Sequence, residues 1–292
     1  MPTTVITGAN SGIGRAAAVQ LAVAGHRVFA TMRSLDKGAK LSAAATDRNV
    51  EVTPVVVDVT DDESVARGFA QILDAAGSID VLVNNAGIGM NATVEDAPLD
   101  EAMGVFDANV WGPVRCAKAV LPAMRAQGSG HIVQISSIAG RVGLPAQPIY
   151  SGSKWALEGM SESMAHNLAP FGIRVSIVEP GVTRTAILAK NSDMPDGTAY
   201  TDAYARMFDM YASGIAANVR PEAVAETIQQ CLEAPPGQMR WPVAWGAAGM
   251  NSGRQTGRIS DTDWVGLGEL APDAPAWCAR FGELFGVDVQ PM

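Results

Sequence analysis

The sequence predicts an α/β protein: a doubly wound parallel sheet in a single domain, with a lid segment and a C-terminal extension. Short runs of Val, Ile and Thr alternate with longer helical patterns along most of the chain. These runs show little polar alternation, which is typical of strands that helices cover on both faces. Because the links are short, right-handed crossovers between parallel strands are expected.

The predicted strands are Thr3–Thr7, Arg27–Met32, Val50–Asp58, Val81–Asn84, His131–Ser136 and Ile173–Glu179. The predicted helices between them are Gly12–Ala24, Asp62–Ala75, Leu99–Ala126 and Tyr150–Leu168. Pro54 falls inside the third strand, and a proline is tolerated at a sheet edge because it has no N–H to donate. This fits the strand order 3-2-1-4-5-6, which places the third strand at an edge. Gly25 follows the first helix directly, where a left-handed C-cap is expected.

Two segments interrupt the alternation. The segment between Gly181 and Arg220 carries no strand signal and is too long for an idle connection. We interpret residues 185–218 as a lid, because apolar residues repeat there with helical spacing: Tyr200, Tyr204, Met207, Phe208, Tyr211 and Ile215. The end of the chain carries a second such stripe, made of Trp277, Phe281, Leu284 and Phe285. The chain therefore divides into a sheet domain, residues 1–245, and an extension, residues 246–292, that packs on the same domain.

Composition excludes several classes of protein. Of the 292 residues, 48% are hydrophobic and 17% charged, which excludes global disorder or a coiled coil. The net charge of −9 disfavours nucleic-acid binding, which needs a basic face. No apolar run is long enough to span a membrane, and the N-terminus has no secretory pattern. Few, distant cysteines predict no disulfide framework and no metal site, and a cytoplasmic location.

The turn after the first strand reads TGANSGIG and leads straight into a helix. Glycines let the backbone turn sharply and let a pyrophosphate approach the amides, while the helix N-terminus offers free N–H groups to that anion. The alternative is a tight turn without a ligand. The predicted cofactor contacts of this turn are Gly8, Asn10, Ser11, Gly12, Ile13 and Gly14.

This TGxxxGxG spacing resembles the short-chain dehydrogenase/reductase family. The other motifs follow in order: Asn84-Asn85-Ala86-Gly87, Ser137, Tyr150-x-x-x-Lys154 and Pro180-Gly181. The resemblance covers residues 3–245 and implies the Rossmann fold. Within this family, the sequence is similar to the branch that includes steroid and retinol dehydrogenases.

The resemblance also implies roles for further residues along the cofactor. Asp58 and Val59 are expected to line the adenine, although a helix or turn cap is the alternative for Asp58. Tyr150 and Lys154 are expected at the nicotinamide, with Lys154 on the ribose hydroxyls. The remaining expected contacts are Asn85, Ala86, Gly87, Pro180, Gly181, Val182, Thr183 and Thr185, with Thr183 near the carboxamide.

The catalytic candidates follow from the chemistry of a carbonyl that gains a hydride. The developing alkoxide needs a proton donor and a hydrogen-bond donor. Tyr150 suits the first role if the Lys154 cation, one helical turn away, lowers its pKa. Ser137 suits the second, with Ser136 as its competitor. The resemblance adds Asn109, linked to the lysine through water.

The residues at the end of the second strand indicate which nicotinamide cofactor is preferred. Where NAD enzymes of this fold carry an acid, this chain has Met32 followed by Arg33. A guanidinium suits a phosphate, and Ser11 and Ser34 can add hydroxyls. An exposed arginine without a ligand is the alternative, and Asp36 is expected to start a helix. We therefore predict a preference for NADP(H), with NAD(H) possible as a second cofactor.

The expected substrate is a small hydrophobic ketone or secondary alcohol. The pocket walls are predicted to include Val142, Leu144, Ile187, Leu188, Met194 and the stretch Tyr204–Tyr211. Ordinary core residues are the alternative for each. A ketoacyl-type carbonyl reductase, an extended-branch epimerase or dehydratase, and a regulatory Rossmann module without catalysis remain as other functions. The helices Leu99–Ala126 and Tyr150–Leu168 are the family's usual association surfaces, so a homodimer or homotetramer is expected.

Overall fold

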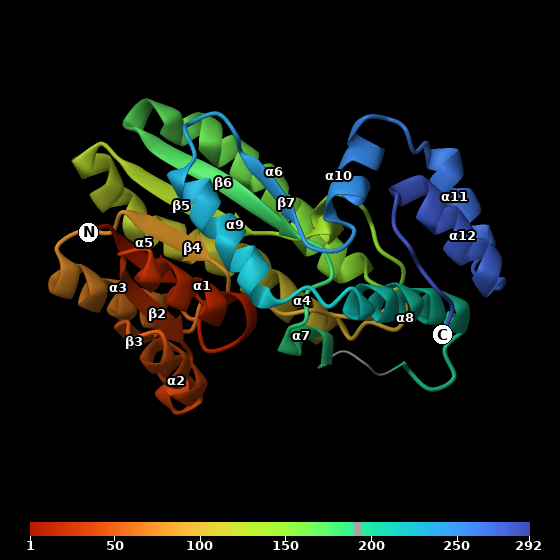
Figure 1. Cartoon of the computed structure of the whole chain (residues 1–292), viewed down its shortest axis with the longest axis horizontal. Coiled ribbons are helices and arrows are strands. Elements are labelled where there is room, and N and C mark those ends of the chain that lie inside the picture. The colour runs from red at the N-terminus through yellow and green to blue at the C-terminus, as the bar shows by residue number, and fades with distance from the viewer. Residues whose placement is uncertain (190–193) are drawn as a thin grey trace.

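The computed structural model describes residues 1–189 and 194–292. In these residues seven parallel strands form one sheet in the order β3-β2-β1-β4-β5-β6-β7 (Figure 1). Their bounds are β1 Thr3–Ile6, β2 Arg27–Met32, β3 Val52–Val56, β4 Val81–Asn84, β5 Gly130–Ile135, β6 Ile173–Pro180 and β7 Arg240–Val243. The predicted order is confirmed for the first six strands. The prediction missed β7, because Arg-Trp-Pro-Val lacks a run of β-branched residues.

The helices are α1 Gly12–Val23, α2 Ala39–Asp47, α3 Asp62–Ala76, α4 Leu99–Phe106, α5 Gly112–Gln127, α6 Pro148–Leu168, α7 Ala186–Ala189, α8 Thr201–Ala216, α9 Pro221–Glu233, α10 Ala247–Gln255, α11 Asp261–Glu269 and α12 Ala274–Phe285. The single helix predicted over Leu99–Ala126 is wrong in detail. A π-helical segment, Asp107–Trp111, separates α4 from α5. Such segments insert a residue into a helix and are common at functional sites. Among the described helices, none has the length and apolarity needed to cross a membrane.

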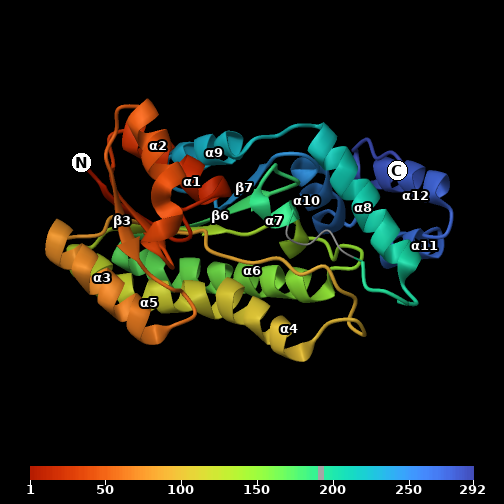
Figure 2. The same ribbon diagram turned by 90° about the horizontal axis from the view of Figure 1, so that it is seen from below.

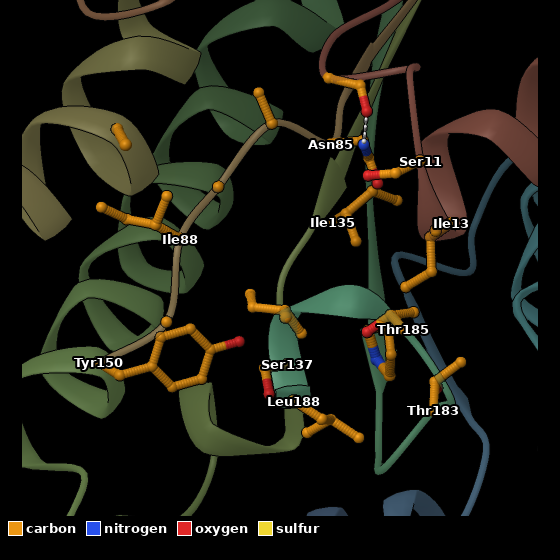
Figure 3. Close-up of a pocket in the computed structure, with 18 of the residues that line it drawn as sticks. Ser11, Ile13, Asn85, Ile88, Ile135, Ser137, Tyr150, Thr183, Thr185 and Leu188 are labelled. Atoms are coloured by element: carbon orange, nitrogen blue, oxygen red, sulfur yellow. Dashed lines mark hydrogen bonds between the residues drawn. The ribbon is translucent and has the colours of Figure 1, made fainter. Parts of the chain in front are cut away.

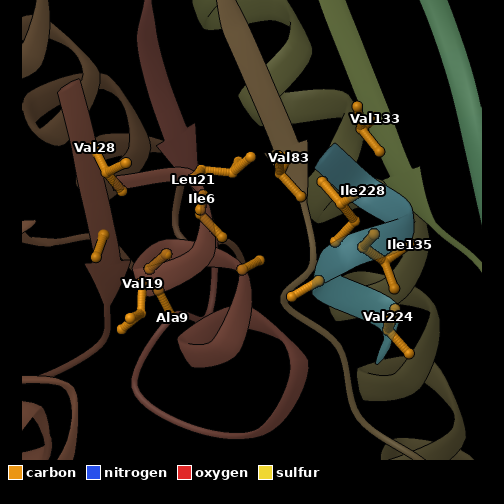
Figure 4. Packing of buried hydrophobic residues seen from close by; sticks show 14 of the residues in the cluster. Ile6, Ala9, Val19, Leu21, Val28, Val83, Val133, Ile135, Val224 and Ile228 are labelled. Atoms are coloured by element: carbon orange, nitrogen blue, oxygen red, sulfur yellow. The ribbon is translucent and has the colours of Figure 1, made fainter. Parts of the chain in front are cut away.

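Helices cover both faces of the sheet, as the strand composition predicted. Alternate strand residues point to opposite faces. Ile6, Val83 and Val133 pack toward α1 and α9 with Leu21 and Ile228 (Figure 4). Their neighbours in sequence face the other layer, which α3, α5 and α6 form (Figure 2).

Two local predictions are confirmed. Among the described strands, β3 pairs with β2 alone, so the exposed Pro54 sits on the edge strand where its missing N–H is harmless. Gly25 has a φ of 88°, the left-handed conformation expected just after a helix. Asp36 lies in the first turn of a short 3₁₀-helix, Leu35–Gly38.

The residues after 245 form α10, α11 and α12, which lie with α8 at one end of the molecule (Figures 1 and 2). Trp277 and Phe281 stack with ring centroids 4.7 Å apart, and Phe285 continues the stack at the same spacing. These aromatic side chains share a core with Ile138 and Leu144, which follow strand β5. The predicted helical stripe is therefore confirmed, and it supports the loop that carries Ser137.

Candidate active site

A cavity of about 430 Å³ opens at the carboxyl ends of six strands, and Figure 3 shows part of its lining. Each of these strands is followed by a residue of the wall: Gly8 after β1, Arg33 after β2, Asp58 after β3, Asn85 after β4, Ser137 after β5 and Gly181 after β6. Parallel sheets bind ligands at this edge, where adjacent strands send their connections to opposite faces.

The glycine-rich turn forms a tight cradle at this edge. Gly8 and Gly12 have φ values of 65° and 53°, which favour glycine. A Cβ on Gly14 would lie 2.4 Å from Asn85 Nδ2 and 2.6 Å from Gly8 O. Gly14 therefore packs behind the turn and is not part of the pocket wall, and its contact with the cofactor stays a prediction.

The amides at the start of α1 face the pocket. Ser11, Gly12 and Ile13 line it together with Asn10. The Ser11 hydroxyl makes no capping bond to the helix, and the first turn of α1 contains no acid. A helix N-terminus without negative charge in its first turn fits the pyrophosphate of a dinucleotide.

The end of the pocket beyond the glycine turn carries the groups expected for the adenosine. Arg33, Asp58 and Val59 line it as predicted. Asp58 Oδ1 also accepts hydrogen bonds from the Thr60 amide (3.0 Å) and hydroxyl (2.7 Å), so the turn-cap alternative holds as well. Lys37, from the 3₁₀-helix after β2, adds a cation that the sequence reasoning missed. The four-residue spacing between Arg33 and Lys37 is the feature of the sequence that could have revealed this second cation.

Ser137, Tyr150 and Lys154 converge on the same cavity. In Figure 3 the Tyr150 hydroxyl points into the pocket toward Ser137. The Lys154 ammonium lies 5.8 Å from the Tyr150 ring centroid, one helical turn along α6. The competing Ser136 also lines the pocket, but its hydroxyl lies beside Gly140 and Glu158: a Cβ on Gly140 would meet both the Ser136 hydroxyl (2.8 Å) and Glu158 Cγ (2.9 Å).

The pKa values of these groups depart from the sequence expectation. Burial raises the pKa of Tyr150, and the interaction with the Ser137 hydroxyl opposes this only in part. The expected net lowering of the Tyr150 pKa by Lys154 is therefore not found. The Lys154 ammonium donates to Ile135 O at 2.9 Å. Burial lowers the pKa of Lys154 itself to about 8, against the influence of Glu158. The Tyr150 phenol is therefore neutral at neutral pH.

Asn109 lies one layer behind the pocket wall, in the π-helical segment. Its Oδ1 accepts from the Ile88 amide at 2.9 Å, and its Nδ2 donates to Ile88 O (2.9 Å) and to the Ser153 hydroxyl (3.0 Å). A Cβ on Gly87 would lie 2.8 Å from Asn109 Oδ1 and 3.8 Å from Lys154 Nζ. Asn109 thus holds the loop after β4 against α6, which carries Lys154.

The segment after β6 closes the pocket on one side. Pro180, Gly181, Val182, Thr183 and Thr185 all line it, together with Ala86 and Gly87 from the opposite wall. A Cβ on Gly181 would lie 1.8 Å from Trp245 O, so the chain after β7 crosses this point in direct backbone contact. The Pro-Gly pair was visible in the sequence, but its reason, the contact with Trp245, was not.

The other end of the pocket is mainly apolar. Its walls include Ile88, Ile138, Leu144, Ile187, Leu188 and Met210. Five predicted wall residues do not line this pocket: Val142, Tyr204 and Met207 are buried behind the wall, Phe208 lines a second pocket, and Met194 lies on the surface, 43% exposed. The sequence reasoning missed Asn91 and Gln147, which bring polar groups to this end beside Tyr211.

A family model described as short chain dehydrogenase matches residues 2–196, which carry this cradle and the Ser137, Tyr150 and Lys154 constellation. The chain belongs to this family. Short-chain dehydrogenases are oxidoreductases that bind NAD(P) and act on CH–OH groups. The resemblance inferred from the motifs is therefore confirmed.

Curated relatives come from the expected branch. Human 17-beta-hydroxysteroid dehydrogenase type 1 is 36% identical over 252 residues, covering 81% of this chain and 76% of its own. Human retinol dehydrogenase 8 is 45% identical over 192 residues, covering 64% of this chain and 61% of its own.

Solved short-chain dehydrogenases share the fold. One from Streptomyces avermitilis superposes with a TM-score of 0.78 at 33% identity, over 92% of this chain and 97% of its own. A metagenomic short-chain oxidoreductase solved with NADP gives a TM-score of 0.65 at 27% identity, over 83% of this chain and 98% of its own.

Proposed function

We propose that this short-chain dehydrogenase is an NADP(H)-dependent oxidoreductase that interconverts a hydrophobic ketone and its secondary alcohol. One observation carries the proposal: Ser137, Tyr150 and Lys154 share a pocket with a glycine cradle and basic residues at one end and apolar walls at the other. A purely regulatory nucleotide-binding module has no need for a serine, a tyrosine and a lysine facing one apolar cavity.

Each catalytic side chain has a separate task in this proposal. A bound nicotinamide supplies or accepts the hydride. Tyr150, neutral because burial raises its pKa, gives its proton to the substrate oxygen during reduction and takes one back during oxidation. Ser137 donates a hydrogen bond that orients the same oxygen. Lys154 supplies a cation next to the phenol and, at the ribose, donor groups.

The preference for NADP(H) rests on two cations at the adenosine end. Arg33 is exposed at the pocket rim and Lys37 lies nearby on the 3₁₀-helix. No carboxylate occupies the end of β2, where NAD enzymes hold the ribose hydroxyls. A guanidinium and an ammonium favour the additional phosphate of NADP(H).

We also propose a homodimer through the layer that contains α4, α5 and α6. Large apolar side chains on these helices and the π-helical segment face solvent, among them Leu99, Met103, Trp111 and Trp155, with exposures of 52–73%. Exposed apolar clusters of this kind commonly mark association surfaces. Light scattering tests this: a dimer is expected for the wild type, and monomers for Trp155→Glu. A monomeric wild type would contradict it.

The proposed activity is tested by NADPH consumption across aliphatic, aromatic and steroid ketones. Reduction of the bulkier apolar ketones is expected, with product alcohol formed in equal amount. NADPH consumption that equals the enzyme-free rate with every ketone would overturn the proposal. Each active ketone is repeated with Tyr150→Phe, so that a contaminating reductase is recognised.

A further inference from the structure

Three polar side chains from separate segments meet at the apolar end of the pocket. Asn91 comes from the loop after β4, Gln147 precedes α6, and Tyr211 lies on α8. Gln147 Nε2 donates to Asn91 Oδ1 at 2.6 Å and to the Tyr211 hydroxyl. The Tyr211 hydroxyl in turn donates to Asn91 Oδ1 at 3.2 Å. These bonds fix the Gln147 amide in one place within an otherwise apolar wall.

This trio leaves one strong acceptor without a partner. Gln147 is only 3% exposed, and among the described residues no donor reaches its Oε1. A buried carbonyl oxygen without a hydrogen bond is costly, and most buried polar groups in proteins are satisfied. In a ligand pocket, such a group is expected to find its partner on the ligand.

The partner must be neutral. The described charged residues of the pocket wall are Arg33, Lys37 and Asp58 at the adenosine end, and Lys154, which is bonded to Ile135 O. A substrate cation near Gln147 would therefore have no counter-ion. A hydroxyl fits this requirement, because it is uncharged and can donate to Gln147 Oε1, whereas both amide hydrogens of Gln147 are already bonded to Asn91 and Tyr211.

The position of the trio ties this hydroxyl to the reacting carbon. Gln147 is the N-cap residue of α6 and Tyr150 lies in the first turn of this helix, and both line the pocket. Burial raises the pKa of Tyr211, and the neighbouring Tyr150 raises it further, which shows that the two phenols lie close together. The trio therefore borders the place where Ser137 and Tyr150 hold the substrate oxygen.

We infer that Gln147, held by Asn91 and Tyr211, is a substrate-binding group that recognises a hydroxyl adjacent to the reacting carbonyl. The preferred substrates are then apolar α-hydroxyketones and, in oxidation, the corresponding vicinal diols. This inference rests on the proposed ketone reduction and narrows its substrate class.

The test compares two ketones of equal size, α-hydroxyacetophenone and propiophenone. Each is titrated calorimetrically into the full chain saturated with NADP⁺, which cannot reduce either ketone. The wild type should bind the hydroxyketone about tenfold more tightly, the effect of one buried hydrogen bond. Gln147→Met should bring the ratio of affinities close to one. Tyr211→Phe is a second, more conservative variant. It removes the hydroxyl that holds the Gln147 amide and should also lower the ratio of affinities.

Leu144→Val is the matched control, since it trims an apolar wall residue and should leave the ratio near tenfold. Equal affinities in the wild type, or a ratio that survives in Gln147→Met, would overturn the inference. Turnover with NADPH separates this from the larger proposal. If the enzyme reduces both ketones without preferring the hydroxyketone, only the hydroxyl-binding role of Gln147 is disproved. If it binds the hydroxyketone more tightly but reduces neither ketone, the proposed reaction is disproved.

Discussion

The Lys154 ammonium donates a 2.9 Å hydrogen bond to the carbonyl oxygen of Ile135. Ile135 is the last residue of β5, and Ser137 follows two residues later. The end of β5 thus positions both the cation and the hydroxyl of the proposed catalytic group. The bond also explains why Lys154 sits deep in the protein, only 6% exposed.

This buried cation predicts a pH-dependent stability. The pKa of Lys154 falls from 10.5 to about 8 because burial disfavours the charge. Since the folded protein binds this proton less tightly than the unfolded chain, the penalty is fully present below pH 8 and disappears as pH rises toward 10.5. The Lys154→Met variant does not carry this penalty. Its free energy of unfolding relative to that of the wild type should therefore fall by about 3 kcal/mol across that pH range. Urea unfolding at each pH measures it; parallel curves for the two proteins would contradict it.

Turnover should depend on the phenol of Tyr150. Tyr150→Phe removes the proposed proton donor but keeps the ring and its packing, so turnover should fall at least about a hundredfold. Affinity for NADP(H) should remain near the wild-type value, as measured by fluorescence titration. Near-normal turnover of a verified ketone by this variant would exclude the proposed mechanism.

Cofactor choice should depend on Arg33. Replacing it with alanine should weaken NADPH binding about tenfold or more, the effect of losing a charge-assisted hydrogen bond, and leave NADH binding unchanged. Adding Met32→Asp should improve NADH binding further. Lys37→Ala is the control for general charge loss and should have a smaller effect. A wild type that favours NADH would disprove this assignment and leave the catalytic residues unaffected.

Stability should depend on the aromatic stack of the C-terminal helices. Phe281 is fully buried between Trp277 and Phe285, so Phe281→Ala should lower the free energy of unfolding by about 3–5 kcal/mol. Val265→Ala, at a side chain 64% exposed on α11, should change it by less than about 0.5 kcal/mol. Equal thermal midpoints for the two variants would mean that the stack contributes little.

Local rules determined much of this protein from the sequence alone. Doubly buried strands, the glycine turn before α1 and the Tyr150–Lys154 spacing each depend on neighbours within a few residues, and sequence displays such neighbours directly. The fold, the strand order and the family were therefore predictable. The interruption of the helix at Asp107–Trp111 was not, because no local residue type marks a π-helical turn.

Contacts between distant segments were decided only by the tertiary structure. Arg240 on β7 bonds Glu158 on α6 at 3.0 Å and lies 3.2 Å from Glu179 on β6, which places buried charges behind the active site. Gln147, Asn91 and Tyr211 likewise meet from three elements. The sequence does not indicate which distant residue will become the hydrogen-bond or ion-pair partner of a polar side chain after folding. The sequence therefore determined the reaction machinery, whereas folding decided the substrate wall, since that wall exists only where distant elements pack together.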